Sequence, residues 1–216
     1  RQRQMCIRDR IYVDKTGLLE FTNNSLDTLQ GYICNSRPRR FGKSITANML
    51  AAYYSKGCDS LEMFSGLQIS NSPDFKKHLN KYDVIHLDIQ WCLGPAGGSA
   101  QVVSYISKKV IEELRSIYPN ALQREVLSLA EALSDINNAT GSKFIIIIDE
   151  WDVLIRDESS LEVQEQYIAF LRGLFKGTEP TKYIKLAYLT GILPIKKEKT
   201  QSAPVSYTHL TLPTTE

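Results

Sequence analysis

The sequence of 216 residues is poor in the features that mark secreted, membrane-spanning and disordered proteins. Its 4 cysteines are scattered and include no C-x-x-C pair, so we expect free thiols in a reducing cytoplasm. The apolar run from Phe144 to Ile148 is far shorter than the about 20 residues that cross a bilayer. No apolar core follows the first residues, so we expect no signal peptide.

A large excess of one charge is also missing. The formal net charge is +2, and the 43% hydrophobic and 23% charged residues are ordinary for a globular protein. This balance gives no general argument for nucleic-acid binding. The composition therefore predicts a cytoplasmic globular protein with no membrane partner.

Both ends of the chain read as translated sequencing adapter. Residues 1–10 are RQRQMCIRDR, and Met5 to Asp9 translate a transposase end sequence from its ATG codon. Residues 205–215 are VSYTHLTLPTT, which the reverse complement encodes. We expect residues 1–10 and 204–216 to be non-native and exclude them from fold reasoning. The native stretch, 11–203, then has no net charge.

Strand and helix signals alternate along the native stretch, which predicts a three-layer α/β domain with a parallel sheet. Strands are expected at about 31–35, 84–89, 144–149 and 185–190. The third of these is so uniformly apolar that both of its faces must be covered, as in a central parallel strand.

Apolar spacing predicts the intervening helices. After the first strand, Ile45, Met49 and Tyr53 are expected to share the buried face of one helix. Further helices are expected at 103–117, 122–136 and 161–175. Loops are expected at 94–98 and 137–141, where glycine, proline and asparagine gather.

The turn after the first strand carries a phosphate-binding pattern. It reads R-P-R-R-F-G-K-S, and the pattern G-x-x-x-x-G-K-[ST] is met except at Arg37. Gly42 lets backbone N–H groups turn toward a phosphate, and Lys43 supplies a positive charge to it. Ser44 offers a hydroxyl to Mg²⁺. The alternative is a basic surface turn capped by Ser44.

The rest of this turn is basic. Arg40 and Phe41 precede Gly42 directly, so we include them among the candidate nucleotide-binding residues. Arg37, Arg39 and Arg40 can contact nucleotide phosphates or acids such as Asp149, or they can bind DNA or RNA.

Two carboxylates follow the uniformly apolar strand. Asp149 and Glu150 stand at its carboxyl end, where open α/β sheets bind ligands. Asp149 is the candidate Mg²⁺ residue, and Glu150 is the candidate base for an attacking water. Thr190 ends the following strand and is a candidate for hydrogen bonding to the γ-phosphate or the water. The alternatives are solvated acids and a threonine that caps the turn before Gly191.

The segment Asn80-Lys81-Tyr82-Asp83 matches the guanine-reading pattern N-K-x-D. That pattern should follow a late strand, downstream of the metal-binding acid. Here it precedes the strand at 84–89, so we interpret it as a polar turn.

Several motifs in order resemble the AAA-ATPase-like family of bacterial proteins. Tyr12-Val13-Asp14-Lys15-Thr16 precedes R-P-R-R-F-G-K-S, and I-I-I-I-D-E-W-D, F-L-R-G-L-F and L-T-G-I-L follow. The resemblance implies a P-loop ATPase that uses ATP and Mg²⁺, with Gly42, Lys43 and Ser44 as Walker A residues. It implies Asp149 and Glu150 as the Walker B pair. For Asp14 and Lys15 it leaves the role open, a place near the nucleotide base being one option.

Family members often carry a PD-(D/E)XK nuclease-like domain after the ATPase domain. The resemblance therefore implies an ATPase that powers or gates an effector, with nucleic acid and other copies of the chain as candidate partners. The alternatives are an ATP-binding switch with little turnover and a nucleic-acid-binding module. Arg172 is either an arginine finger for a neighbouring copy or an ion-paired helix residue.

On this interpretation residues 11–203 are an ATPase domain that is incomplete at both ends. The fifth strand, which should flank the first, is expected beyond Ala203 and absent. The first strand would then lie at a sheet edge, and such edges promote aggregation. We therefore expect marginal stability.

Overall fold

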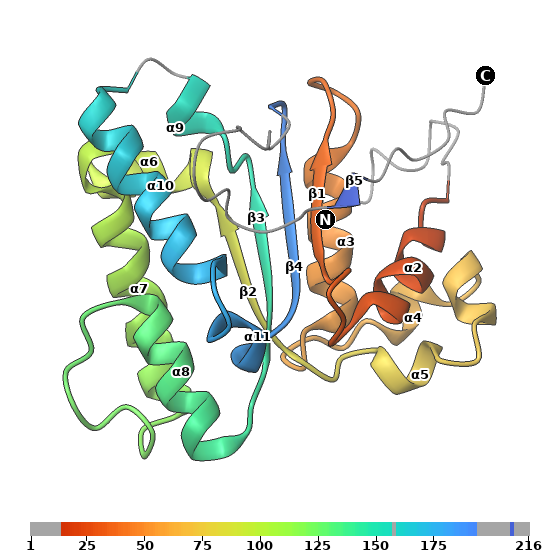
Figure 1. Cartoon of the computed structure of the whole chain (residues 1–216). Helices are drawn as coiled ribbons and strands as arrows, with labels where there is room; N and C mark the ends of the chain where they lie inside the picture. Colours follow the sequence, from red (N-terminus) through yellow and green to blue (C-terminus); the bar gives the residue numbers. More distant parts are fainter. Residues whose placement is uncertain (1–13, 157–158, 194–207, 210–216) are drawn as a thin grey trace.

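A parallel β-sheet forms the middle layer of the computed structural model, which describes residues 14–156, 159–193 and 208–209 (Figure 1). Its strands lie in the order β2-β3-β4-β1-β5, and every pairing is parallel. They are β1 (Tyr32–Ser36), β2 (Asp83–Asp88), β3 (Phe144–Asp149), β4 (Ile184–Gly191) and β5 (Thr208–His209). The α/β class and the four expected strands are confirmed.

Helices cover both faces of the sheet (Figure 1). One face carries α2 (Gly17–Ser25), α3 (Lys43–Tyr54), α4 (Leu61–Phe64) and α5 (Phe75–His78). The other carries α6 (Ile89–Ala96), α7 (Val102–Ile117), α8 (Leu129–Thr140) and α10 (Leu161–Phe175). Shorter segments are η1 (Gln68–Asn71), η2 (Ser99–Gln101), α9 (Val153–Arg156) and α11 (Pro180–Tyr183). No helix within the described ranges is long and apolar enough to cross a membrane.

The apolar strand β3 divides its side chains between two cores. Ile145 and Ile147 pack with the α2 and α3 side of the sheet. Phe144, Ile146 and Ile148 pack with the helices of the opposite side. Alternate residues of a strand point to opposite faces, so a strand covered on both faces must be apolar throughout.

The helix expected at 122–136 is wrong in its first half, because α8 begins only at Leu129. Ser128 caps it, its hydroxyl accepting a hydrogen bond of 3.2 Å from the backbone N–H of Glu131. Leu122 and Val126 are buried in the core without being helical. The spacing of Leu122 and Val126 therefore reflects their burial and does not indicate a helix.

The two loops between these helices and strands are shorter than expected. At 94–98, α6 includes Pro95 and continues to Ala96, and left-handed Gly97 (φ 79°) ends it. At 137–141, α8 continues to Thr140 and ends at left-handed Gly141 (φ 73°). In both places the glycine marks the end of the helix and the residues before it remain helical.

The buried face of α3 differs from the expected one. Ile45 is 71% exposed, whereas Ala47, Leu50 and Tyr53 are fully buried against the sheet. The spacing of four from Ile45 to Tyr53 drifts around a helix of 3.6 residues per turn. Ile45 is therefore exposed, Met49 is partly buried against the core, and Tyr53 is fully buried.

The outer side of β1 is paired, contrary to expectation. Ile33 lies opposite Thr208, and Cys34 lies opposite His209, in a parallel ladder with β5. These partners come from the segment that we attribute to adapter, and they occupy the place of the strand expected to be absent. The predicted edge position of β1 is therefore wrong for two of its five residues.

Two substitutions on α3 test its observed orientation. Leu50→Ala should lower the free energy of unfolding by about 2–5 kcal/mol, since it removes a fully buried side chain and leaves a cavity. Ile45→Ala is the matched control and should change it by less than about 0.5 kcal/mol, since Ile45 is 71% exposed. Urea unfolding followed by circular dichroism measures both. Equal losses would contradict the assignment of the buried face.

Candidate functional site

The turn between β1 and α3 presents backbone N–H groups toward solvent. Arg40 (φ 70°) and Gly42 (φ 76°) both adopt left-handed conformations, with Phe41 between them. In the described part of the chain, the N–H groups from Gly42 to Ile45 donate to no backbone carbonyl. Such a turn at a helix N-terminus is a binding place for anions.

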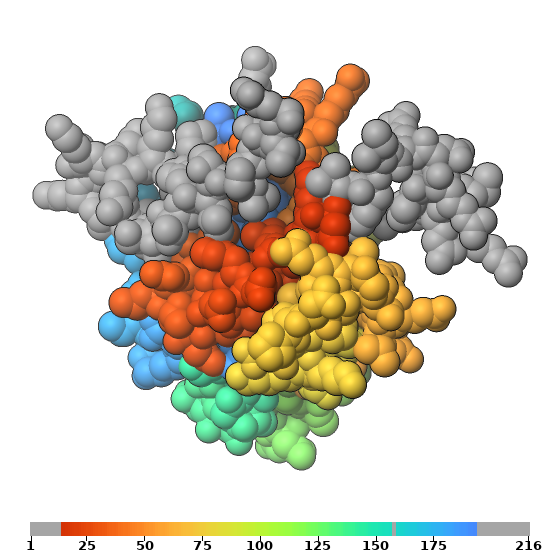
Figure 2. Space-filling model, turned by 90° about the vertical axis from the view of Figure 1, so that its right-hand side faces the viewer, coloured from red at the N-terminus to blue at the C-terminus, as the bar shows by residue number. Residues whose placement is uncertain are grey.

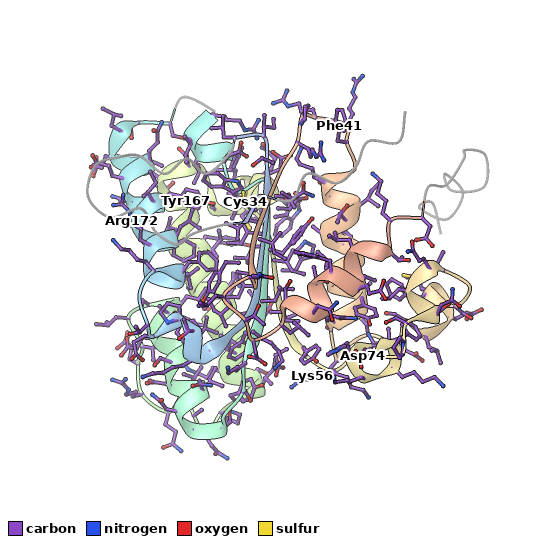
Figure 3. All side chains as sticks on the ribbon, turned by 45° about the vertical axis from the view of Figure 1, so that its right-hand side comes forward. Cys34, Phe41, Lys56, Asp74, Tyr167 and Arg172 are labelled. Carbon is purple, nitrogen blue, oxygen red and sulfur yellow. The ribbon has the colours of Figure 1, made fainter. Side chains whose placement is uncertain are left out.

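The side chains of this turn differ in their surroundings. Lys43 is buried, and its Nζ donates a hydrogen bond of 3.1 Å to the carbonyl of Pro38. Ser44 is exposed, and among the described residues its hydroxyl has no hydrogen-bond partner. Arg40 is exposed too, and Phe41 stands at the tip of the turn, 52% exposed (Figure 3). Lys43 thus closes the turn on itself, while Ser44 is available to a ligand.

The strand register brings polar residues together at the carboxyl edge of the sheet. Thr190 is the partner of Asn35 across β1 and β4, and Asp149 is the partner of Asp88 across β2 and β3. Between them the Thr190 hydroxyl donates a hydrogen bond to Asp149 Oδ1. Thr190 is therefore a buried partner of Asp149 rather than a cap of the following turn.

The Asp149 carboxylate is buried and fixed in orientation. Besides Thr190, the backbone N–H of Glu150 donates to Oδ1 at 3.0 Å. Oδ2 accepts no hydrogen bond from any residue that the structure describes. One oxygen of Asp149 is thus saturated, and the other is available to an external donor or to a cation's hydration shell.

Glu150 lies in an ion-pair network that the sequence reasoning missed. Its carboxylate accepts a hydrogen bond of 2.6 Å from Arg156 Nη2, and Arg156 Nε lies 3.1 Å from Asp152 Oδ2. Asp152 is fully buried and accepts from the backbone N–H groups of Ile192 (2.9 Å) and Leu193 (2.7 Å). The i,i+4 spacing of Asp152 and Arg156 was the available signal.

The phosphate turn and the carboxylates do not touch. Among the described residues, Lys43 and Ser44 form no hydrogen bond to Asp149 or Glu150. Strand β4 lies between β1 and β3, so the two groups follow strands that are not neighbours in the sheet. A ligand that contacts both groups must extend across the carboxyl end of β4.

Two other sequence features have clear outcomes. Asn80 donates to the carbonyls of Ala52 (3.0 Å) and Ser55 (2.9 Å), so the N-K-x-D segment is a structural turn as expected.

Arg172 lies on α10 (Figure 3) and has no carboxylate within ion-pair distance in the described ranges. The ion-paired alternative for Arg172 therefore gains no support from those residues.

Comparison with known proteins gives a family match over most of the chain. A family described as Predicted AAA-ATPase matches residues 2–200. The match begins inside the segment that we attribute to adapter, so that attribution stays a prediction. The chain is also 27% identical over 197 residues to a protein of Azotobacter chroococcum mcd 1 described as "Uncharacterized protein in vnfD 5'region". That alignment covers 88% of this chain and 35% of the relative's length.

A substitution at the end of β4 tests the packing that holds the carboxylate edge. A Cβ on Gly191 would lie 2.6 Å from Trp151 Nε1 and 2.7 Å from Asp152 Oδ1. Gly191→Ala should therefore lower the free energy of unfolding by about 1–3 kcal/mol. Gly94→Ala is the control, because nothing lies within 4 Å of its Cβ position. It should be neutral or stabilising by up to about 1 kcal/mol in thermal and urea unfolding. Equal stability of the two variants would contradict this packing.

Proposed function

This chain belongs to the Predicted AAA-ATPase family, and from that membership we propose that it binds ATP with Mg²⁺ and hydrolyses it. The observation that carries the proposal is the arrangement at the carboxyl edge of the sheet. A turn of free N–H groups follows β1, and an oriented carboxylate ends β3, with β4 between them. A nucleotide triphosphate with its cation matches the charges of these groups and is long enough to extend across the end of β4.

The residues present fit a magnesium ion. The candidate ligands are the Ser44 hydroxyl and Asp149 Oδ2, both oxygen atoms without a hydrogen-bond partner in the described part of the chain. Mg²⁺ prefers oxygen ligands and retains several waters, so two protein groups at some distance suffice. When bound it supplies charge neutralisation to the phosphate oxygens.

Each remaining candidate has a role that its position supports. Lys43 is to exchange the Pro38 carbonyl for a phosphate oxygen, since a negatively charged acceptor attracts the ammonium group more strongly than a neutral carbonyl does. Glu150 is to orient and deprotonate the attacking water. Thr190 holds Asp149 in place and stands beside it at the same edge. Arg40 and Phe41 flank the phosphate turn as further candidate contacts.

A second candidate function is an ATP-binding switch with little turnover. The observation that favours it is the ion pair of 2.6 Å between Glu150 and Arg156. A Glu150 oxygen that is held by the Arg156 guanidinium is not free to orient an attacking water. On this view hydrolysis needs an event that separates the two side chains.

The larger role that we propose is to power or gate an attached effector, in the longer protein of which residues 11–203 would be one domain. Most of the length of the Azotobacter chroococcum relative lies outside the aligned region, which leaves room for such a domain in that protein. The basic turn 37–40 lies directly at the phosphate site, so we assign it to nucleotide rather than to DNA or RNA.

Removal of the Lys43 amine tests nucleotide binding. Lys43→Ala should weaken Mg·ATP binding at least about tenfold, the equivalent of one charge-assisted hydrogen bond. Isothermal titration of the folded chain measures this. Lys108→Ala, an exposed lysine on α7, is the control and should bind as the unchanged chain does. Unaltered affinity in Lys43→Ala would contradict the site.

Replacement of the Glu150 carboxylate tests the base. Glu150→Gln should bind Mg·ATP normally and lose turnover by about 100-fold or more, since general-base catalysis contributes that much. The measurement is phosphate release from ATP by the full-length protein. Glu165→Gln, an exposed residue of α10, is the control. Normal hydrolysis by Glu150→Gln would show that another group acts as base.

A further inference from the structure

The N-terminal segment before α2 brings a second lysine to the phosphate turn. Lys15 Nζ lies 3.5 Å from the place of a Cβ on Gly42, and apart from the two chain neighbours of Gly42 no other described residue comes within 4 Å of that place. The Lys15 side chain is exposed, and its ammonium group has no ion-pair or hydrogen-bond partner among the described residues. Its positive charge is thus held beside the free N–H groups without a counter-ion from those residues.

Asp14 and Thr16 hold Lys15 in this position. Asp14 Oδ2 accepts a hydrogen bond of 2.7 Å from the backbone N–H of Gln68, and Thr16 Oγ1 accepts one of 3.1 Å from Ile69. Asp14 Oδ1 in turn accepts from the Thr16 hydroxyl at 2.6 Å. The residues on both sides of Lys15 are therefore tied to η1. In Figure 2 the red N-terminal segment lies directly beside the yellow segment of the α4–α5 region.

The pKa of Asp14 is consistent with this anchoring role. Partial burial raises it, but the hydrogen bonds from Thr16 and Gln68 outweigh burial and place the pKa below its ordinary value. Asp14 is therefore ionised at neutral pH. The hydrogen bonds from Thr16 and Gln68 occupy both of its carboxylate oxygens, so we treat Asp14 as a positioning residue.

The helix that follows fixes the segment from its other side. The Thr22 hydroxyl of α2 hydrogen-bonds the Tyr54 hydroxyl of α3 at 2.7 Å, and Tyr54 donates to Asn23 Oδ1 at 2.9 Å. These contacts join the C-terminal ends of α2 and α3. Lys15 and Gly42 precede the N-terminal ends of the same two helices. The two helices thus run side by side in the same direction, and this places Lys15 at the phosphate turn.

We propose that Lys15 is a second phosphate-binding lysine, whose ammonium group contacts a phosphate of the nucleotide bound at Gly42 to Ser44. The proposal rests on the proposed function, since it needs an anionic ligand at that turn. In this proposal Asp14 and Thr16 anchor the D-K-T segment, and Lys15 contacts the ligand. It differs from a contact with the nucleotide base, because Gly42 belongs to the phosphate turn.

Binding of Mg·ATP, inorganic tripolyphosphate and adenosine to the folded chain tests the proposal. Lys15→Met should bind Mg·ATP and inorganic tripolyphosphate about 5- to 20-fold more weakly, the loss expected for one charge-assisted contact. Lys15→Arg should retain most of the affinity. Thermal stability should not change, because Lys15 is exposed. Lys76→Met, an exposed lysine of α5, is the control and should match the unchanged chain.

The outcomes separate this inference from the proposed function. If Lys43→Ala loses ATP binding and Lys15→Met stays within twofold of the unchanged chain, only the role of Lys15 is overturned. If Lys15→Met loses affinity for adenosine but not for tripolyphosphate, the contact is to the base and the phosphate assignment is wrong. If the folded, unchanged chain binds neither ATP nor tripolyphosphate, both proposals fall.

A double-substitution cycle tests the positioning role of Asp14. Asp14→Asn should weaken ATP binding in the unchanged background and have no further effect when Lys15→Met is already present. A purely structural role would lower affinity equally in both backgrounds, and that result would overturn the positioning role.

Discussion

The candidate site depends on the burial of β3 between two strands and two helical layers. Because all six residues of β3 are buried, its backbone is fixed by both neighbours, and its last residue emerges beside Thr190. An aspartate that is 3% exposed is costly unless its oxygens are hydrogen-bonded. Thr190 and the backbone of Glu150 meet this need at Oδ1, and Oδ2 accepts no hydrogen bond from the described residues. The sheet therefore holds the Asp149 carboxylate in one orientation.

The sequence predicted the parts of the fold that have strong local patterns. The apolar run of β3 and the helix Leu161–Phe175 were located within a residue. Leu122 and Val126 led to a wrong helix prediction, because these buried residues of an irregular segment have helical spacing. Neither the contact of Arg156 with Glu150 nor that of Lys15 with Gly42 was predicted. The position of Lys15 depends on how α2 packs on α3, which no local pattern encodes. The Glu150–Arg156 pair lies within one short segment, where the i,i+4 spacing of Asp152 and Arg156 was the only local signal.

The backbone after β3 leaves Glu150 little freedom except in its side chain. Its left-handed conformation (φ 53°) costs about 1 kcal/mol or more in a residue other than glycine, and persists only where the surroundings determine it. The neighbouring Trp151 N–H donates to the Thr190 carbonyl at 2.9 Å, and the Trp151 carbonyl accepts from the buried Tyr167 hydroxyl at 2.7 Å. Release from Arg156 therefore needs rotation of the Glu150 side chain and no movement of the strand.

The two halves of the site belong to different layers of the molecule. The phosphate turn opens α3 and is flanked by Lys15 on the α2 side. Arg156 ends α9 and Asp152 directly precedes that helix, which packs with α10 on the other side. Within the described residues, no side-chain contact joins Lys43 to Glu150. A ligand that contacts both halves must therefore link the two layers across the edge of the sheet. Under the proposed function, nucleotide with its cation is such a ligand, and its binding would couple the helices of both faces.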